Sequence, residues 1–449
     1  MSSMPEMAPT TKKILIVTYF YPPMLSIATQ RLLALSKKLS EKGWAVSVLS
    51  VDPEREGIAE TKTDKGLNAL IPKGVKVYRI GSLRTPPGPS DASRASGASP
   101  ARSLFSKVRR RIFLRDPQEG WMRKAARAAE SIIAEREISL VFVSVPPHSL
   151  LVLASRLHRR IRIPVVTDFR DNWITNGEAV FLTPVHRWIA YRTEKRAISC
   201  SSLVISVQKD LLETWKVPIA MHVPNGYDEA LFPSAGGVER LPKYTISYLG
   251  SLYGGRNPEA LFHAVGALAR EIPHLADSLS VEFWGWNWNT DLTKLSATFE
   301  TGDIVRAMGV LKYKDSLMRL CQSDVLLLII PQKRTEGEST VYTGKLFEYL
   351  YSGNPILALA PTSGAAADMI RKYDAGFVID TEDWRGVRDV LRAEVRAFLQ
   401  GNRREVRFRR MDEYSRSALN ERVERSLAEI LEAGRGPTAG ERMTGRSII

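Results

Sequence analysis

The sequence predicts an α/β protein made of two doubly wound parallel domains. The chain has 449 residues, which is more than one hydrophobic core usually organises. Short apolar runs such as KKILIVT (12–18) and SLVFVSV (139–145) alternate with longer amphipathic stretches. Runs that alternate at this spacing are typical of strands and helices in a parallel sheet. We therefore expect two Rossmann-like domains.

Strand and helix patterns place the domain boundaries. The first domain is predicted over 12–223, with an insertion at 84–103 that is rich in Pro, Gly, Ser and Ala and is expected to be mobile. A fresh apolar run, TISYLGS, opens a second domain over 224–380. The basic, amphipathic segment 381–434 is expected to form helices that pack back toward the N-terminal domain. Residues 1–11 and 435–449 are predicted to be disordered ends.

Composition restricts the class of protein and its compartment. Hydrophobic residues make up 44% of the chain, and no apolar run has the roughly 18 residues of a spanning helix. The start, MSSMPEMAPTTKK, lacks the basic and apolar segments of a signal peptide. We expect a cytoplasmic protein, peripheral at the inner face of the cell membrane. Cys200 and Cys321 are far apart and outside any Cys/His cluster, so no metal site is expected.

The charge balance points to a polyanionic partner. The formal net charge is +15, which fits nucleic acid, an anionic membrane or a phosphorylated substrate. No nucleic-acid-binding signature accompanies the charge, so we expect no nucleic acid partner. Residues 104–115, LFSKVRRRIFLR, have apolar and basic side chains at helical spacing. They are predicted to contact anionic lipid, and the alternative is an ordinary helix with a solvated basic face.

The loop and helix at 331–350 carry the strongest candidate site. A polar loop leads into a helix that begins near Thr343 or Gly344, where free backbone N–H groups favour a phosphate. Lys345 lies in the first turn and can neutralise a diphosphate. Glu348, three residues later, can accept hydrogen bonds from two ribose hydroxyls. The alternative is a surface ion pair between Lys345 and Glu348.

Other polar loops follow predicted strands, where ligands bind in parallel sheets. GSLYGGRN (250–257) is a candidate phosphate cradle, and the alternative is a flexible turn with a solvated arginine. His148 follows two prolines and can act as a base or bind phosphate, although a loop histidine is more often structural. In DFRDNW, the side chains of Asp168, Arg170 and Asp171 either orient an acceptor hydroxyl or pair with one another.

Six landmarks in one order resemble family 4 glycosyltransferases of bacterial polysaccharide and lipopolysaccharide assembly, over roughly residues 12–380. They are KKILIVTYFYPP with Arg31, VPPHS, PVVTDFRDNW, SLVISV with VPNGYDEALF, YLGSLYGGRNPE, and YTGKLFEYLYSGNPIL. The resemblance implies the GT-B fold, in which two Rossmann-like domains face each other across a cleft. It also implies a retaining hexosyltransferase that moves a sugar from a nucleotide-diphosphate sugar to a glycan or lipid-linked acceptor, with no metal or other cofactor.

The resemblance also assigns roles to residues. Glu348 is placed at the donor ribose, and Lys345 and Arg256 at the diphosphate. His148 is placed near the transferred sugar and the acceptor. The implied catalytic residues are His148, Asp171, Arg256 and Lys345. The remaining implied donor contacts are Gly250, Ser251, Thr343 and Gly344, and the implied acceptor contacts are Arg31, His148, Asp168, Arg170 and Asp171.

The sequence departs from the family pattern at three places. Thr340 stands where the family has an acid, and Glu336 and Glu338 are out of register with that position. Ser251 stands where a basic residue is usual, and SIAT (26–29) replaces a glycine-rich loop. We predict a change of specificity rather than a loss of catalysis.

Two other functions remain open. A sugar-nucleotide epimerase shares the architecture and the donor. A catalytically silent, membrane-associated scaffold of a polysaccharide assembly complex fits the departures at Thr340 and Ser251. Retention of Arg256, Lys345 and Glu348 argues against the scaffold, which has no need to bind a diphosphate.

Overall fold

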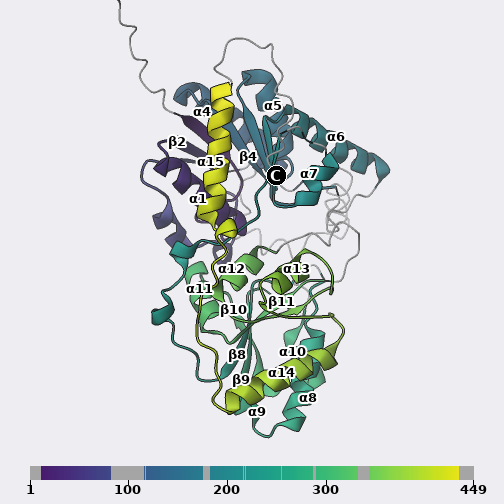
Figure 1. The fold of residues 1–449 in the computed structure, drawn as a ribbon. Helices are drawn as coiled ribbons and strands as arrows, with labels where there is room; N and C mark the ends of the chain where they lie inside the picture. The colour runs from purple at the N-terminus through teal and green to yellow at the C-terminus, as the bar shows by residue number, and fades with distance from the viewer. Residues whose placement is uncertain are drawn as a thin grey trace, which may run out of the picture. The chain divides into compact units, whose positions relative to one another are not determined.

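The computed structural model describes the chain from Lys12 to Ala433 with internal gaps, and it divides this chain into two compact units (Figure 1). Unit 1 runs up to Pro224 and resumes at Arg416, whereas unit 2 is Asn225–Ser415. The described residues are 12–81, 116, 118–174, 183–215, 217, 219–253, 255–286, 290–331 and 343–433. The segments 1–11, 84–103, 104–115 and 435–449, about which the sequence makes predictions, lie outside these residues.

Unit 1 is built on a seven-stranded parallel sheet with the order β3-β2-β1-β4-β5-β6-β7. The order reverses between β1 and β4, which is the point where doubly wound sheets bind ligands. The strands are β1 (Lys13–Val17), β2 (Ala45–Val51), β3 (Lys76–Ile80), β4 (Leu140–Val145), β5 (Val165–Phe169), β6 (Leu203–Ser206) and β7 (Ala220–His222). The helices are α1 (Ile27–Glu41), α4 (Glu119–Arg136), α5 (Leu150–Ile161), α6 (Pro184–Cys200), α7 (Lys209–Trp215) and α15 (Arg416–Ala433).

Both faces of this sheet are covered by helices, which explains why its central strands are largely apolar. Ile14 and Ile16 of β1 pack on the layer of α1 and α15, whereas Leu15 and Val17 pack on the layer of α4 and α5. Successive side chains of a strand point to opposite faces, so one apolar run serves two cores. Helices α1 and α15 lie side by side in Figure 1 although they are far apart in the sequence.

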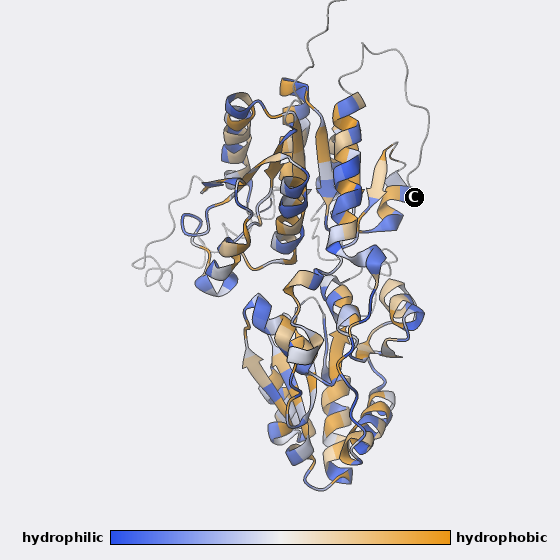
Figure 2. Ribbon diagram, turned by 60° about the vertical axis from the view of Figure 1, so that its left-hand side comes forward, coloured by the Kyte–Doolittle hydropathy of each residue, from blue (hydrophilic) through white to orange (hydrophobic). Residues whose placement is uncertain are grey.

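Unit 2 repeats the architecture with a six-stranded parallel sheet, ordered β10-β9-β8-β11-β12-β13. Its apolar strands are flanked by helices with polar outer faces (Figure 2). The strands are β8 (Tyr244–Leu249), β9 (Leu279–Trp284), β10 (Val305–Gly309), β11 (Val325–Ile329), β12 (Ile356–Leu359) and β13 (Gly376–Ile379). The helices are α8 (Glu259–Glu271), α9 (Leu275–Ser278), α10 (Leu292–Phe299), α11 (Tyr313–Gln322), α12 (Gly344–Ser352), α13 (Ala365–Lys372) and α14 (Trp384–Leu399). The predicted α/β class with two parallel sheets is confirmed.

The segment predicted as one C-terminal helical region, 381–434, is shared between the units. In α14, Val387, Leu391 and Val395 pack into the core of unit 2. In α15, Leu419, Val423, Leu427 and Leu431 pack into the core of unit 1. Amphipathic spacing predicts each helix but does not indicate which sheet it covers.

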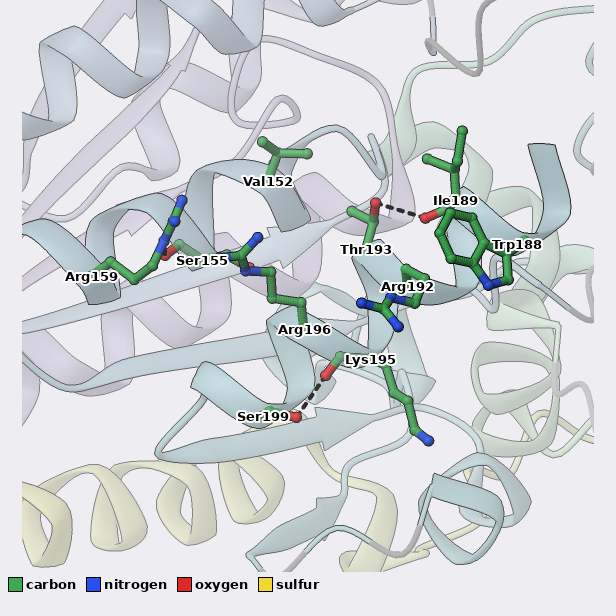
Figure 3. Close-up of a pocket in the computed structure, with 10 residues that line it drawn as sticks. All are labelled: Val152, Ser155, Arg159, Trp188, Ile189, Arg192, Thr193, Lys195, Arg196 and Ser199. Atoms are coloured by element: carbon green, nitrogen blue, oxygen red, sulfur yellow. Dashed lines mark hydrogen bonds between the residues drawn. The ribbon is translucent and has the colours of Figure 1, made fainter. Parts of the chain in front are cut away.

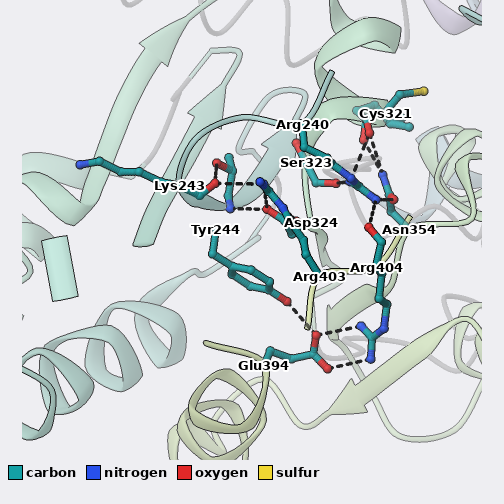
Figure 4. Close-up of polar contacts among 12 residues, drawn as sticks. Arg240, Lys243, Tyr244, Cys321, Ser323, Asp324, Asn354, Glu394, Arg403 and Arg404 are labelled. Atoms are coloured by element: carbon teal, nitrogen blue, oxygen red, sulfur yellow. Dashed lines mark hydrogen bonds and ion pairs between the residues drawn. The ribbon is translucent and has the colours of Figure 1, made fainter. Parts of the chain in front are cut away.

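An ionic network centred on buried Asp324 holds the chain that follows α14 against unit 2 (Figure 4). Arg403 donates from Nε to Oδ1 of Asp324 over 2.7 Å and from Nη2 to Oδ2 over 2.8 Å. The backbone N–H of Thr245 donates to the same carboxylate over 2.8 Å. Beside it, Glu394 accepts from Arg404 and from the hydroxyl of Tyr244. These charges line a cavity of about 400 Å³ and have protein partners, so the network is structural.

None of the described helices is long and apolar enough to cross a membrane.

Candidate functional site

At the carboxyl end of β8 in unit 2, the backbones of the loops that follow β8 and β9 lie close to each other. Gly250 follows β8 with a φ of +127°, and its N–H donates to the carbonyl of Trp284 over 2.7 Å. Gly285 follows β9 with a φ of +134°, and a Cβ there would lie 2.5 Å from the carbonyl oxygen of Gly250. Because only glycine adopts these conformations without strain, the two loops can lie backbone against backbone at this edge of the sheet.

Lys345 points into this edge from the first turn of α12. Its ammonium lies 4.0 Å from the centroid of the Tyr248 ring, near enough for a cation–π interaction. A Cβ on Gly250 would lie 2.7 Å from Nζ of Lys345. The charged end of Lys345 therefore lies directly beside the residue that follows β8.

Burial dominates the electrostatics of Lys345. Loss of solvent lowers the pKa of Lys345 to about 7, and the charge of Arg256 acts in the same direction. Glu348 opposes both as a nearby negative charge. The nearby negative charge of Glu348 does not offset the loss of solvent around the Lys345 ammonium. An anionic ligand bound beside the ammonium would raise the pKa of Lys345 again.

The N-terminus of α12 adds further polar groups. Helix α12 has nine residues, and its N-cap, Thr343, makes no capping hydrogen bond with its side chain. Oγ1 of Thr343 is buried and has no hydrogen-bond partner among the described residues. The first N–H groups of a helix lack partners within it and favour an anion. Thr343, Gly344 and Lys345 thus offer a hydroxyl, backbone N–H groups and an ammonium from one short segment.

Glu348 and Arg256 complete the predicted donor set. Oε1 of Glu348 accepts a 2.7 Å hydrogen bond from the hydroxyl of Tyr313, at the start of α11. Arg256 donates from Nη1 to the carbonyl of Tyr253 over 3.0 Å, and its guanidinium lies 4.0 Å from the centroid of that ring. Tyr248, Tyr253 and Tyr313 contact these charged groups, and none of the three was predicted from the sequence. The chain has 14 tyrosines, so the residue type alone does not single out a site.

Three of the predicted acceptor residues of unit 1, Arg31, Asp168 and Arg170, belong to one buried network. Arg31 donates to Asp168 from Nη2 over 2.8 Å and from Nε over 3.3 Å. Its Nη1 donates to the carbonyls of Val223 and Pro224, each over 2.9 Å. The guanidinium thus joins the end of β5 to the chain that leaves β7. The alternative left open from the sequence was pairing among Asp168, Arg170 and Asp171, whereas the ion pair of Asp168 is with Arg31, which lies outside that segment.

Ser144 links Asp168 to Arg170 within that network. Its hydroxyl donates to Oδ2 of Asp168 over 2.8 Å and accepts from Nε of Arg170 over 3.0 Å. Arg170 also donates to the carbonyl of Pro146. Burial lowers the pKa of Arg170 to about 10, while Asp171 and Asp168 raise it, so the guanidinium stays charged at neutral pH. Ser144 was missed, although a serine within the apolar run SLVFVSV was a visible signal.

His148 lies just before α5 and, unlike the charged and hydrogen-bonded residues of the network, has an unpaired polar atom within the described residues. Its ring stacks on Trp173, with 5.0 Å between the centroids and 5° between the planes. Burial lowers the pKa of His148 to about 4, Arg170 adds to this effect, and a hydrogen bond with the backbone of Asp171 opposes it. The imidazole is therefore neutral at pH 7. Its Nε2 is buried without a hydrogen-bond partner among the described residues, which leaves one polar atom for a ligand.

Some positions of the sequence that bear on the donor site are not described by the structure. Thr340, Glu336 and Glu338 lie outside the described residues. Ser251 is described, and its carbonyl accepts a hydrogen bond from the hydroxyl of Tyr248 over 3.0 Å.

The structure brings the seven predicted donor residues together at one edge of unit 2. It brings the predicted acceptor residues together in unit 1, around Asp168 and His148.

Comparison with known proteins identifies the fold. No protein-family model matches the sequence, and no curated protein matches it. Among solved structures, the sucrose-phosphate synthase of Thermosynechococcus elongatus is similar at a TM-score of 0.57 and 11% identity, over 94% of this chain and 98% of that one. WaaG, a glycosyltransferase involved in lipopolysaccharide biosynthesis, is similar at 0.53 and 13% identity, over 94% and 98%.

A third similar structure is a putative UDP-N-acetylglucosamine 2-epimerase from Listeria monocytogenes, with a TM-score of 0.56 and 11% identity over 94% of this chain and 97% of that one. Likeness at such low identity indicates a shared fold and leaves the reaction open. Both parallel sheets and nearly the whole length of the chain take part in it. The chain therefore has the two-sheet α/β fold of GT-B glycosyltransferases, as the sequence predicted.

Proposed function

We propose that this chain is a retaining glycosyltransferase of family 4 type that uses a nucleotide-sugar donor in cell-surface polysaccharide biosynthesis. The observation that carries the proposal is the position of Lys345. This residue belongs to the first turn of α12, and its ammonium lies beside Gly250. Arg256 and the helix N-terminus add positive charge at the same edge. Together these groups suit the diphosphate of a nucleotide sugar.

Charge stabilisation is the central step of the proposed reaction. The bond between the anomeric carbon and the diphosphate oxygen breaks, and the diphosphate leaves with the electron pair. An acceptor hydroxyl forms the new bond on the same face of the sugar, and its proton passes to an oxygen of the departing diphosphate. Lys345, Arg256 and the N–H groups of α12 stabilise the negative charge that develops on the diphosphate. Glu348, oriented by Tyr313, accepts hydrogen bonds from the ribose.

Unit 1 is proposed to bind the acceptor, which is a glycan or a lipid-linked sugar. His148 is neutral, and its Nε2 has no partner within the described ranges, so it can hydrogen-bond to a hydroxyl of the transferred sugar or the acceptor. Asp171 is proposed to assist there. Arg31, Asp168 and Arg170 hold the surrounding loops through the buried network. A cytoplasmic location at the inner membrane face, with contact through 104–115, belongs to this proposal.

Two alternatives make different predictions. An epimerase converts the nucleotide sugar without releasing the nucleotide, and its fold is represented among the similar structures. A silent scaffold has no need of the donor. The partly desolvated ammonium of Lys345 argues against the scaffold, because removing a charge from water costs stability.

Nucleotide binding by the purified chain tests the proposal. UDP, GDP, ADP, dTDP and their sugar conjugates are compared for their effect on the melting temperature, which rises when a ligand binds only the folded state. We expect one nucleotide class to stabilise the protein, and Lys345→Ala and Glu348→Ala to remove that effect. Lys314→Ala and Glu382→Ala, at exposed positions of unit 2, are the matched controls and should bind as the wild type does.

Product analysis then separates the reactions. Release of free nucleotide that depends on an acceptor extract supports glycosyl transfer. Conversion of the donor to its epimer without release would identify an epimerase. A folded protein that no nucleotide stabilises would refute the donor site and favour the scaffold.

A further inference from the structure

Helix α6 of unit 1 exposes apolar side chains at its N-terminal end. Val185 is 61% exposed and Trp188 is 58% exposed, with Ile189 at 43%. The opposite face of the helix is buried through Ala190, Glu194, Ala197 and Ile198. Because residues three and four apart share a helix face, the exposed apolar side chains form one patch.

Basic side chains continue the same face toward the C-terminus of α6. Arg192, Lys195 and Arg196 follow the apolar patch at helical spacing and are exposed. Arg192 lies over the Trp188 ring, 5.3 Å from its centroid. We call the exposed face of Val185, Trp188, Ile189, Arg192, Lys195 and Arg196 the α6 face.

A groove of about 630 Å³ runs between α5 and the α6 face (Figure 3). Helix α5 contributes Val152, which is 47% exposed, and Arg159. The described residues that line the groove include four cations and no carboxylate. The cations are Arg159, Arg192, Lys195 and Arg196.

These cations are not used to hold the fold. Within the described parts of the chain, none of the four forms an ion pair, and Arg159 donates only to the backbone carbonyl of Ser155. Their neighbours on α5 behave differently, because Arg156 and Arg160 both pair with Glu130. The groove therefore presents positive charge that no carboxylate in the described part of the chain neutralises.

We infer that the α6 face and its groove bind the surface of an anionic lipid bilayer. Unpaired cations attract anionic headgroups, and an exposed tryptophan flanked by aliphatic side chains enters the boundary between headgroups and acyl chains. A nucleic acid would satisfy the cations but would leave Val185, Trp188 and Ile189 in water. The inference goes beyond the donor site, which lies in unit 2, and it concerns a different segment from 104–115.

Vesicle binding by the full chain tests the inference. The protein is sedimented with vesicles of phosphatidylcholine alone and with vesicles that contain roughly 30% phosphatidylglycerol, a content that gives a negative surface. We expect binding only to the anionic vesicles, weakened by salt. Arg192→Glu with Arg196→Glu should lower the partition coefficient at least about tenfold. Trp188→Ser with Ile189→Ser should lower it by a similar factor.

Matched controls separate this surface from net charge and from the donor site. Arg385→Glu with Arg396→Glu makes the same charge change at exposed positions of α14 and should bind within about twofold of the wild type. The nucleotide-dependent rise in melting temperature should be unchanged in all three double variants. If it is unchanged while lipid binding is absent, the lipid inference fails and the proposed function stands.

Two further outcomes would overturn the inference. Wild-type vesicle binding by both α6 variants would place the contact elsewhere, for example at 104–115. An effect of the charge reversals without any effect of the Trp188 and Ile189 changes would indicate a general polyanion site. To locate the insertion, quenching by brominated lipid is compared between the wild type and Trp188→Phe, because the chain has nine tryptophans. The wild type should lose more fluorescence than the variant.

Discussion

Lys345 occupies the space that a side chain on Gly250 would need, since a Cβ there would lie 2.7 Å from the ammonium nitrogen. Gly250→Ala should therefore displace the ammonium and weaken nucleotide binding by about tenfold or more. It should also lower the free energy of unfolding by about 1–3 kcal/mol, because its φ of +127° strains alanine. Calorimetric titration and urea unfolding measure the two effects. Gly401→Ala is the control, because Gly401 has a φ of +81° and nothing within 4 Å of an added Cβ. It should lose stability and keep nucleotide affinity.

Lys345→Met should make the ligand-free protein more stable at neutral pH while it abolishes nucleotide binding. Burial lowers the pKa of Lys345 to about 7 in the folded state. Between that pKa and the unfolded value of about 10.4, the unfolded chain binds the extra proton, so wild-type stability rises with pH. The advantage of Lys345→Met should be about 2–4 kcal/mol at pH 6 and should disappear by about pH 10. A variant less stable than the wild type at pH 6 would contradict this electrostatic account.

Glu194→Gln should stabilise unit 1 above neutral pH. Burial raises the pKa of Glu194 to about 7, against a smaller opposing effect of a hydrogen bond with Trp215. The folded state therefore holds a proton that the unfolded chain loses near pH 4.5, and wild-type stability falls as pH rises from about 4.5 to 7. The variant should exceed the wild type by about 2–3 kcal/mol at pH 8 and equal it near pH 4. Denaturant unfolding at both pH values measures this, with exposed Glu213→Gln as the control.

Asp324→Asn should destabilise unit 2 by about 2–4 kcal/mol, because the carboxylate of Asp324 is buried and its removal leaves the half-buried guanidinium of Arg403 without its charge partner. The bond from the Thr245 N–H to the same side chain weakens as well. Urea unfolding at neutral pH measures the loss. Asp368→Asn removes an exposed carboxylate 3.8 Å from Arg371 and should change stability by less than about 0.5 kcal/mol. Equal effects of the two changes would show that the network in Figure 4 contributes little.

The fold was predictable because its signals are local. Runs such as KILIV of β1 and LVFVSV of β4 are apolar on both faces, and the start of α12 at Gly344 follows a polar stretch of sequence. The partners of the site were not predictable, because they come from distant elements. Tyr313 meets Glu348 across 35 positions, and Ser144 meets Asp168 across 24. A charged residue in a helix is expected to be solvated, so nothing in the sequence separated buried Glu194 from exposed Lys195.

The return of the chain from unit 2 to unit 1 has a consequence for biosynthesis on the ribosome. Helix α15 covers the sheet of unit 1 with Leu419, Val423, Leu427 and Leu431, yet it is translated after all of unit 2. Until then, Ile14, Ile16 and the apolar side of α1 lack a cover that the finished protein has. Unit 2 is continuous from Asn225 to Ser415 and can complete its core first. Unit 1 is therefore synthesised first but completes its core last. A nascent chain that is stalled before Arg416 exposes part of this core, and we expect chaperones to bind it.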